Sequence, residues 1–199
     1  MTTDIFSQHI TLENERALLR PIEENDFNNL LSFSLNEPEI WKYGLLTAAG
    51  EDNLRNYLKL AVDNHNEKKE YTFIVFDKKA NAYAGSTRFY DIQQSFLSAQ
   101  LGYTWYGKDF QRTGLNRHCK LLLLSFVFEE WELERLEFRA HAQNYKSIEA
   151  MKAIGCTMEG TLRSHMPTVS GERRDSVVLS ILKNEWLNGG KEKLIAKII

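Results

Sequence analysis

The strongest constraint on the fold is a change of hydrophobic pattern between residues 100 and 141. A strand pattern ending at Trp105 gives way to a glycine-containing loop and a long apolar helix, and a second strand pattern follows in which Leu136, Phe138 and Ala140 alternate with charged residues. A long helical connection between two strands suits a parallel crossover within one sheet. The helix is apolar on two sides, as helices buried between layers are. We therefore expect an α/β fold, a mixed and mainly antiparallel sheet with helices on both faces.

The other segments fit this architecture. Their patterns predict a first strand near His9 to Leu19, a helix opened by Glu23, a helix over Glu51–Asn66, a three-strand antiparallel meander over 71–105, a helix after Asn144 closed by Gly155, and a hairpin of 161–169 with 173–182 around Ser170-Gly171-Glu172.

Length and composition predict one domain. The chain has 199 residues, 43% of them hydrophobic, which is enough for a single substantial core. Only three prolines occur, and no Pro-rich linker marks a boundary. We expect a single domain over 1–187 and a C-terminal extension over 188–199.

Charge and cysteine usage favour a cytoplasmic protein without nucleic-acid or membrane partners. The net charge is −2, with acidic and basic residues mixed along the chain, so no basic stripe for nucleic acid stands out. The first residues have no basic leader, and the apolar patch around 121–128 is too short for a bilayer. Cys119 and Cys156 lack metal-ligand spacing and are expected to be buried thiols, so no metal is predicted.

The loop Gln111-Arg112-Thr113-Gly114-Leu115-Asn116 stands directly before the long helix. A flexible loop that brings backbone N–H groups to a helix start makes an anion site. Gly114 has no Cβ to obstruct an approaching ligand, and Gln111 and Arg112 add side-chain donors. The alternative is that Gly114 only forms a turn and Asn116 only caps the helix.

A second polar motif lies downstream, where Asn144-Tyr145-Lys146-Ser147 opens a helix and Glu159-Gly160 follows it. Together with the loop and the element order, these residues resemble the GNAT family of acyl-CoA-dependent N-acetyltransferases, from Arg16 to Trp186. The likeness is strongest to the branch that contains the ribosomal-protein N-terminal acetyltransferases. The family's pyrophosphate loop reads Gln/Arg-x-x-Gly-x-Gly/Ala. Gln111 and Gly114 fit it, whereas Asn116 departs from the general pattern but is similar to this branch.

The resemblance implies acetyl-CoA as cosubstrate, bound where two central strands splay apart. A backbone N–H in that splayed strand would hold the thioester carbonyl. The implied coenzyme-binding residues are Tyr103, Thr104, Trp105, Gln111, Arg112, Thr113, Gly114, Leu115, Asn116 and Asn144.

The resemblance also implies catalytic residues. Asn144 and Ser147 lie three residues apart at a helix start and can face the same side. In the resembled branch the serine protonates the coenzyme sulfur, a role that falls here on Ser147; an N-cap and a first-turn residue are the alternative reading. Some relatives carry a glutamate base where Met166 stands, so His165 is the nearest titratable candidate. The sequence is equally compatible with a structural role for His165, in which case the proton of the amine leaves through a chain of water molecules.

The acceptor is an amine whose identity the sequence leaves open. The segment Glu37–Tyr43 forms one wall of the acceptor cleft in the family, and its acidic and aromatic residues, with Asp175, would suit a cationic amine. The branch favours a peptide N-terminal α-amine over a polyamine, an amino acid or an amino-sugar. Two non-enzymatic roles are the alternatives. The protein could bind acyl-CoA without turning it over, or it could form a homodimer through Trp186 and the tail 194–199.

Overall fold

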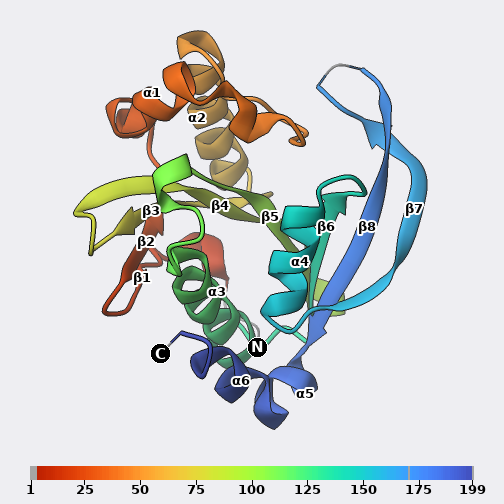
Figure 1. Ribbon diagram of the computed structural model, residues 1–199. Helices are drawn as coiled ribbons and strands as arrows, with labels where there is room; N and C mark the ends of the chain where they lie inside the picture. The colour runs from red at the N-terminus through yellow and green to blue at the C-terminus, as the bar shows by residue number, and fades with distance from the viewer. Residues whose placement is uncertain (1–3, 170, 199) are drawn as a thin grey trace.

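The computed structural model describes residues 4–169 and 171–198, in which one twisted sheet of eight strands runs through the molecule (Figure 1). The strand order is β1-β2-β3-β4-β5-β6-β8-β7. The strands are β1 (Leu12–Glu13), β2 (Ala17–Pro21), β3 (Tyr71–Asp77), β4 (Ala82–Gln93), β5 (Ser98–Tyr106), β6 (Arg135–His141), β7 (Thr157–Pro167) and β8 (Arg173–Leu182). Within these residues every neighbouring pair is antiparallel except β5 and β6, which confirms the predicted crossover.

Helices cover both faces of the sheet, as predicted (Figure 1). Helices α1 (Phe27–Asn36) and α2 (Glu51–Asn66) close a core on one face together with Ile74 and Trp105. On the other face the larger core receives α3 (Leu115–Ser125), α4 (Tyr145–Ala153) and α6 (Lys191–Ile195). The short helical segments are η1 (Ile5–Ser7), η2 (Glu24–Asp26), η3 (Pro38–Trp41), η4 (Gln94–Phe96), η5 (Lys108–Phe110), η6 (Phe126–Glu130), α5 (Lys183–Glu185) and η7 (Trp186–Gly190).

The sheet opens between its two parallel strands. Strand β5 pairs with β6 only from Ser98 to Gln100, and beyond Gln100 the strands diverge. On its other edge β5 carries a bulge, because Ser86 pairs with Trp105 and Arg88 with Gly102, so two residues of β5 stand opposite one of β4. A bulge bends the strand that holds the extra residue. Tyr103, inside the bulge, has a left-handed backbone with φ of 48°.

Several element boundaries differ from the prediction, among them the start of α3, which is Leu115 with Gly114 as N-cap and not a residue after Asn116. The strand expected near His9 to Leu19 is split into β1 and β2, because the Asn14 side chain accepts hydrogen bonds from the amides of Arg16 and Ala17 and makes a turn. Strand β7 begins at Thr157 rather than at Thr161. Ser170, expected in the following turn, lies outside the described residues.

The C-terminal residues pack on the main core. Trp186 and Leu194 are 1% and 2% exposed, and the Arg117 guanidinium donates to the Lys197 carbonyl at 2.8 Å. The chain itself covers Trp186 and Leu194, so these two side chains offer no exposed surface for self-association, whereas Ile195 is exposed. Ile199 lies outside the described residues, and the homodimer stays a prediction.

Candidate active site

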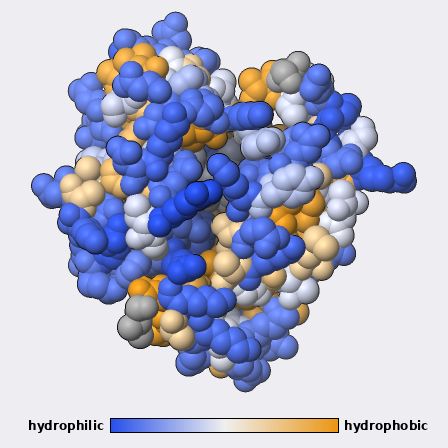
Figure 2. Space-filling view, viewed as in Figure 1, coloured by the Kyte–Doolittle hydropathy of each residue, from blue (hydrophilic) through white to orange (hydrophobic). Residues whose placement is uncertain are grey.

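A cleft of about 1310 Å³ occupies the space opened between β5 and β6. Its walls also include the segment after α1, the start of α3, one side of α4, and β7 and β8. The space-filling view shows the molecule hollowed between the α1–α2 side and the β7–β8 side, with hydrophilic side chains around the opening (Figure 2). The divergence of two parallel strands thus forms a large site at the centre of the sheet.

The loop before α3 forms one end of the cleft. Gly114 precedes the first helical residue with φ of +90°, and a Cβ built there meets no atom within 4 Å. Among the residues that the structure describes, the amides of Arg112, Thr113, Gly114 and Asn116 donate to no protein acceptor. No acidic residue stands in the first turn of α3. Free amides at a helix start fit an anionic group.

The side chains of this loop divide into two groups. Gln111, Arg112 and Asn116 line the cleft, although the Gln111 amide also donates to the Tyr106 carbonyl at 2.9 Å. The Thr113 and Leu115 side chains do not line it: Thr113 donates to the Phe110 carbonyl, and Leu115 is buried in the core. These two residues therefore offer the site only their backbone. Further basic side chains on the cleft wall, Arg117 and Lys146, complement the loop.

The β5 residues of the expected site also differ in what they present. Tyr103, Thr104 and Trp105 all line the cleft, and the Tyr103 ring stacks edge-on against Tyr90 at 5.0 Å. Trp105 is 7% exposed and packs against Trp41 in the core beneath α1 and α2. Beyond Gln100 the β5 edge that faces β6 has no strand partner, so its backbone groups are open to a ligand.

Lys120 is a cleft residue that the sequence analysis did not select. Its side chain lies inside the molecule at 5% exposure, and its ammonium donates to Thr104 Oγ1 at 3.1 Å. Burial lowers the pKa of Lys120 to about 8. The sequence did contain a signal for this burial, because Lys120 lies on the apolar face of α3, one turn before Leu123 and Leu124.

We expect Lys120→Met to raise the free energy of unfolding near pH 7 by on the order of 3 kcal/mol, because the folded state no longer buries a charge. In the wild-type protein the unfolded chain binds more protons between pH about 8, the folded pKa, and 10.5, the ordinary one. The free energy of unfolding of the wild-type protein should therefore rise with pH through this window. The variant should not show this rise. Urea unfolding from pH 7 to 10 measures the difference.

Lys193→Met, on the exposed side of α6, is the matched control and should leave the pH dependence unchanged. A Lys120→Met protein less stable than wild type across the whole range would contradict the prediction. In that case the bond to Thr104 would outweigh the cost of burying the ammonium.

Helix α4 brings the second predicted motif to the cleft. Asn144 is the N-cap, and its Oδ1 accepts from the Ser147 amide at 3.2 Å. Both residues line the cleft, whereas Tyr145 is 72% exposed and lies outside it. The capping bond uses the Ser147 backbone and leaves its hydroxyl free to face a ligand.

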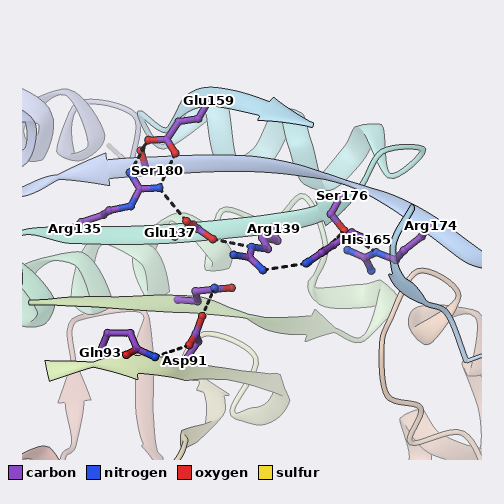
Figure 3. A network of polar contacts seen from close by, with 11 residues as sticks. Asp91, Gln93, Arg135, Glu137, Arg139, Glu159, His165, Arg174, Ser176 and Ser180 are labelled. Carbon is purple, nitrogen blue, oxygen red and sulfur yellow. Dashed lines mark hydrogen bonds and ion pairs between the residues drawn. The ribbon is translucent and has the colours of Figure 1, made fainter. Parts of the chain in front are cut away.

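His165 lies on the opposite wall within a chain of polar contacts (Figure 3). Its Nε2 lies 3.4 Å from Arg139 Nη1, and its Nδ1 lies 3.1 Å from Ser176 Oγ. A guanidinium only donates, so Nε2 accepts and Nδ1 carries the proton. Burial and the neighbouring arginines lower the pKa of His165. An engaged Nε2 and a lowered pKa both weaken His165 as a general base.

The expected acidic wall of the acceptor cleft is absent from this part of the described structure. Glu39 lines the cleft, but its carboxylate is paired with the Lys108 ammonium. Glu37 accepts from the Lys108 amide at 2.7 Å, and Asp175 accepts from the Ser164 amide at 2.7 Å; neither lines the cleft. The aromatic residues expected in this wall, Trp41 and Tyr43, do line the cleft.

Arg174 and Arg139 are further cleft residues that the sequence analysis missed. Arg174 and Ser176 alternate on one face of β8, and Arg139 extends from β6 toward His165. A period-two pattern places Arg174 and Ser176 on one side of a strand. Which side faces the cleft depends on how β8 pairs with β6 and β7.

The described residues hold neither a metal-ligand cluster nor a membrane-spanning helix. No group of three His, Cys, Asp or Glu side chains gathers as a metal site there. None of the helices in that part of the chain combines the length and the apolar character needed to cross a bilayer.

Comparison with known proteins gives consistent matches. Residues 16–157 match the acetyltransferase (GNAT) domain family. The "Uncharacterized N-acetyltransferase p20" of Bacillus licheniformis is 26% identical over 177 residues, covering 88% of this chain and 98% of that protein. The "Putative ribosomal N-acetyltransferase YdaF" of Bacillus subtilis (strain 168) is 27% identical over 178 residues, covering 87% and 94%.

A solved structure shows the same fold. The crystal structure of a GCN5-related N-acetyltransferase from Brucella melitensis superposes with a TM-score of 0.87 at 22% identity, over 96% of this chain and 86% of that one. Since the family match covers well over half of the sequence, the chain belongs to the GNAT acetyltransferase family and is an N-acetyltransferase, in a family that takes its acetyl group from acetyl-CoA.

Proposed function

We propose that this protein transfers the acetyl group of acetyl-CoA to a primary amine, with the α-amine of a peptide or protein N-terminus as acceptor. The observation that carries the proposal is the cleft at the β5–β6 divergence, which has unpaired loop amides at one end and the free Ser147 hydroxyl on its wall. These parts serve the two needs of the reaction, anchoring an anionic coenzyme and assisting a departing thiolate.

The loop end fits the coenzyme pyrophosphate. In the proposal the amides of Arg112, Thr113, Gly114 and Asn116 donate to phosphate oxygens. The start of α3 adds its positive dipole end, and the Arg112 and Arg117 side chains add charge. Leu115 packs in the core and holds the first turn of α3 against the sheet.

The bulge end fits the thioester. Acetyl-CoA supplies an activated acyl group, and backbone N–H groups of β5 near Tyr103, Thr104 and Trp105 would stabilise the charge that develops on its carbonyl oxygen. Ser147 donates a proton to the departing sulfur, and Asn144 holds the first turn of α4 so that the hydroxyl keeps its position.

The amine must lose a proton before or during attack. We propose that it leaves through water in the open cleft. His165, whose two ring nitrogens are engaged by Arg139 and Ser176, then acts by holding those partners in place.

A peptide α-amine suits the wide opening of the cleft, and one relative carries a ribosomal acetyltransferase name. The test is incubation with acetyl-CoA and a panel of peptides, amino acids, polyamines and amino-sugars, with thiol release and product mass as readouts. We expect release that depends on an amine and a product heavier by one acetyl group. Tight coenzyme binding without amine-dependent release would instead support the non-catalytic acyl-CoA-binding module.

A further inference from the structure

Arg174 is a buried positive charge in the cleft without a carboxylate partner. Arg174 is only 5% exposed, yet it lines the cleft. Nε donates to Ser176 Oγ at 3.1 Å and Nη1 donates to the Tyr43 carbonyl at 3.2 Å, and no acidic group of the described residues faces it. Burial lowers the pKa of Arg174, a sign that its charge is poorly compensated.

The surroundings of Arg174 are positive or neutral. Ser176 also accepts from His165, which in turn faces the Arg139 guanidinium (Figure 3). The charge of Arg174 acts on the phenols of Tyr90 and Tyr103, and Tyr103 belongs to the β5 bulge. Arg174 therefore lies toward the thioester end of the cleft, away from the loop that fits the pyrophosphate.

The carboxylates that line the cleft, among the described residues, already have partners. Glu39 pairs with Lys108, and Asp91 accepts from Gln93 at 2.9 Å and from Gln100 at 2.6 Å. Neither neutralises Arg174. The coenzyme's phosphates have their own basic residues, Arg112 and Arg117, at the other end of the cleft.

A purely structural role for Arg174 leaves this charge unexplained. Holding the Tyr43 carbonyl and the Ser176 hydroxyl needs a hydrogen-bond donor only, and an uncompensated buried guanidinium is costly. An arginine fork is the side chain best suited to a carboxylate or phosphate. An anionic ligand group would complete the site.

We propose that Arg174 binds an oxyanion, carboxylate or phosphate, that the acceptor carries close to its reactive amine. The inference rests on the proposed acetyl transfer and narrows its acceptor to anionic amines. The same chemistry is present in a peptide with an acidic residue beside its N-terminus, in a free amino acid and in an amino-sugar phosphate.

The first experiment needs no mutation and uses matched acceptors that differ in the anionic group: an N-terminal Ser-Asp peptide against Ser-Asn, L-serine against L-serinamide, and a hexosamine phosphate against the hexosamine. For the acceptor class that the enzyme uses, kcat/KM should be about 10- to 100-fold higher for the anionic acceptor than for its neutral counterpart, which is the range of a charge-assisted hydrogen bond. The pair with the largest ratio identifies the source of the oxyanion.

The second experiment uses variants. Arg174→Gln should remove this preference, mainly by raising the KM of the anionic acceptor far more than that of the amide acceptor, while the KM for acetyl-CoA stays near wild type. Arg174→Lys keeps the charge without the fork and should restore part of the preference. Arg173→Gln makes the same charge change at the neighbouring exposed position and should leave the preference intact.

Calorimetric titration with the N-acetylated acid and its amide measures the same preference without turnover. Equal use of both members in every pair, a preference for polyamines, or an intact preference in a folded Arg174→Gln protein would overturn the inference. In each of these outcomes thiol release still occurs, so the proposed acetyl transfer stands. Loss of thiol release with every amine would refute the proposed function instead.

Discussion

We expect Ser147→Ala to lower kcat by about 10²- to 10⁴-fold, the usual contribution of a general acid. The hydroxyl acts mainly on the departing sulfur, so the KM for acetyl-CoA should change little. The fold should survive, because Ser147 contributes its backbone amide, not its hydroxyl, to the capping bond with Asn144. Steady-state kinetics with an amine substrate found in the panel, together with a thermal unfolding curve, test both statements.

Tyr145→Phe is the matched control, since it removes a hydroxyl from the same helical turn at a side chain that is 72% exposed and outside the cleft. It should keep wild-type kcat. Near wild-type kcat in Ser147→Ala, with chemistry shown to be rate-limiting, would move the proton donor elsewhere. Tyr103 is then the next candidate, because it lines the cleft and burial raises the pKa of its phenol, which keeps the proton in place.

Gly114→Val is expected to weaken acetyl-CoA binding by about 10- to 100-fold, the cost of losing a charge-assisted hydrogen bond to a phosphate. A Cβ built at residue 114 meets no protein atom within 4 Å, and Gly114 lines the cleft, so a Val side chain there would take up space open to the ligand and compete with it. Calorimetry with acetyl-CoA and with coenzyme A measures the loss directly.

Backbone strain has to be separated from this effect, because φ of +90° at Gly114 disfavours any residue with a Cβ. Gly50 provides the control: it precedes α2 with φ of +84°, has equally open space, and lies outside the cleft. Gly50→Val should therefore lose stability through strain at a positive φ, more than Gly114→Val because ψ is 154° at Gly50 and −20° at Gly114, and should keep its affinity for acetyl-CoA. Unchanged affinity in a folded Gly114→Val protein would show that the phosphates bind elsewhere.

These two variants separate the two ends of the site. A loss of affinity in Gly114→Val without a change in kcat at saturation would locate binding at the loop. A loss of kcat in Ser147→Ala without a change in affinity would locate chemistry at α4. The Arg174 variants then address the acceptor alone.

Local patterns in the sequence were sufficient for most of the fold. Helix α2 has the predicted bounds, Glu51–Asn66, because its apolar spacing and its flanking residues depend only on neighbours along the chain. The parallel pairing of β5 and β6 also followed, since a long helical connection returns the chain to the same sheet in the same direction. The split of the first strand was missed, because it depends on one side-chain turn at Asn14.

For the candidate site, sequence spacing placed Asn144 and Ser147 on one side of a helix start and residues 111–116 at the start of α3. Asn144, Ser147, Gln111, Arg112, Gly114 and Asn116 line one cleft. Spacing did not show that the side chains of Thr113 and Leu115 turn away from the cleft. The Thr113 side chain is held by a local hydrogen bond to the Phe110 carbonyl three residues earlier, whereas the direction of Leu115 is set by burial in the core, which is tertiary in origin.

The charge of the acceptor wall was decided by the tertiary structure alone. The sequence predicted an acidic wall from Glu37 and Glu39, but Lys108, distant along the chain, occupies both of these acidic residues. Arg174 faces the cleft because β8 pairs between β6 and β7, a long-range arrangement that turns one face of the strand inward. Local sequence determines which elements form and which residues share a face, whereas the pairing of distant segments decides which charges are neutralised and which are left for a ligand.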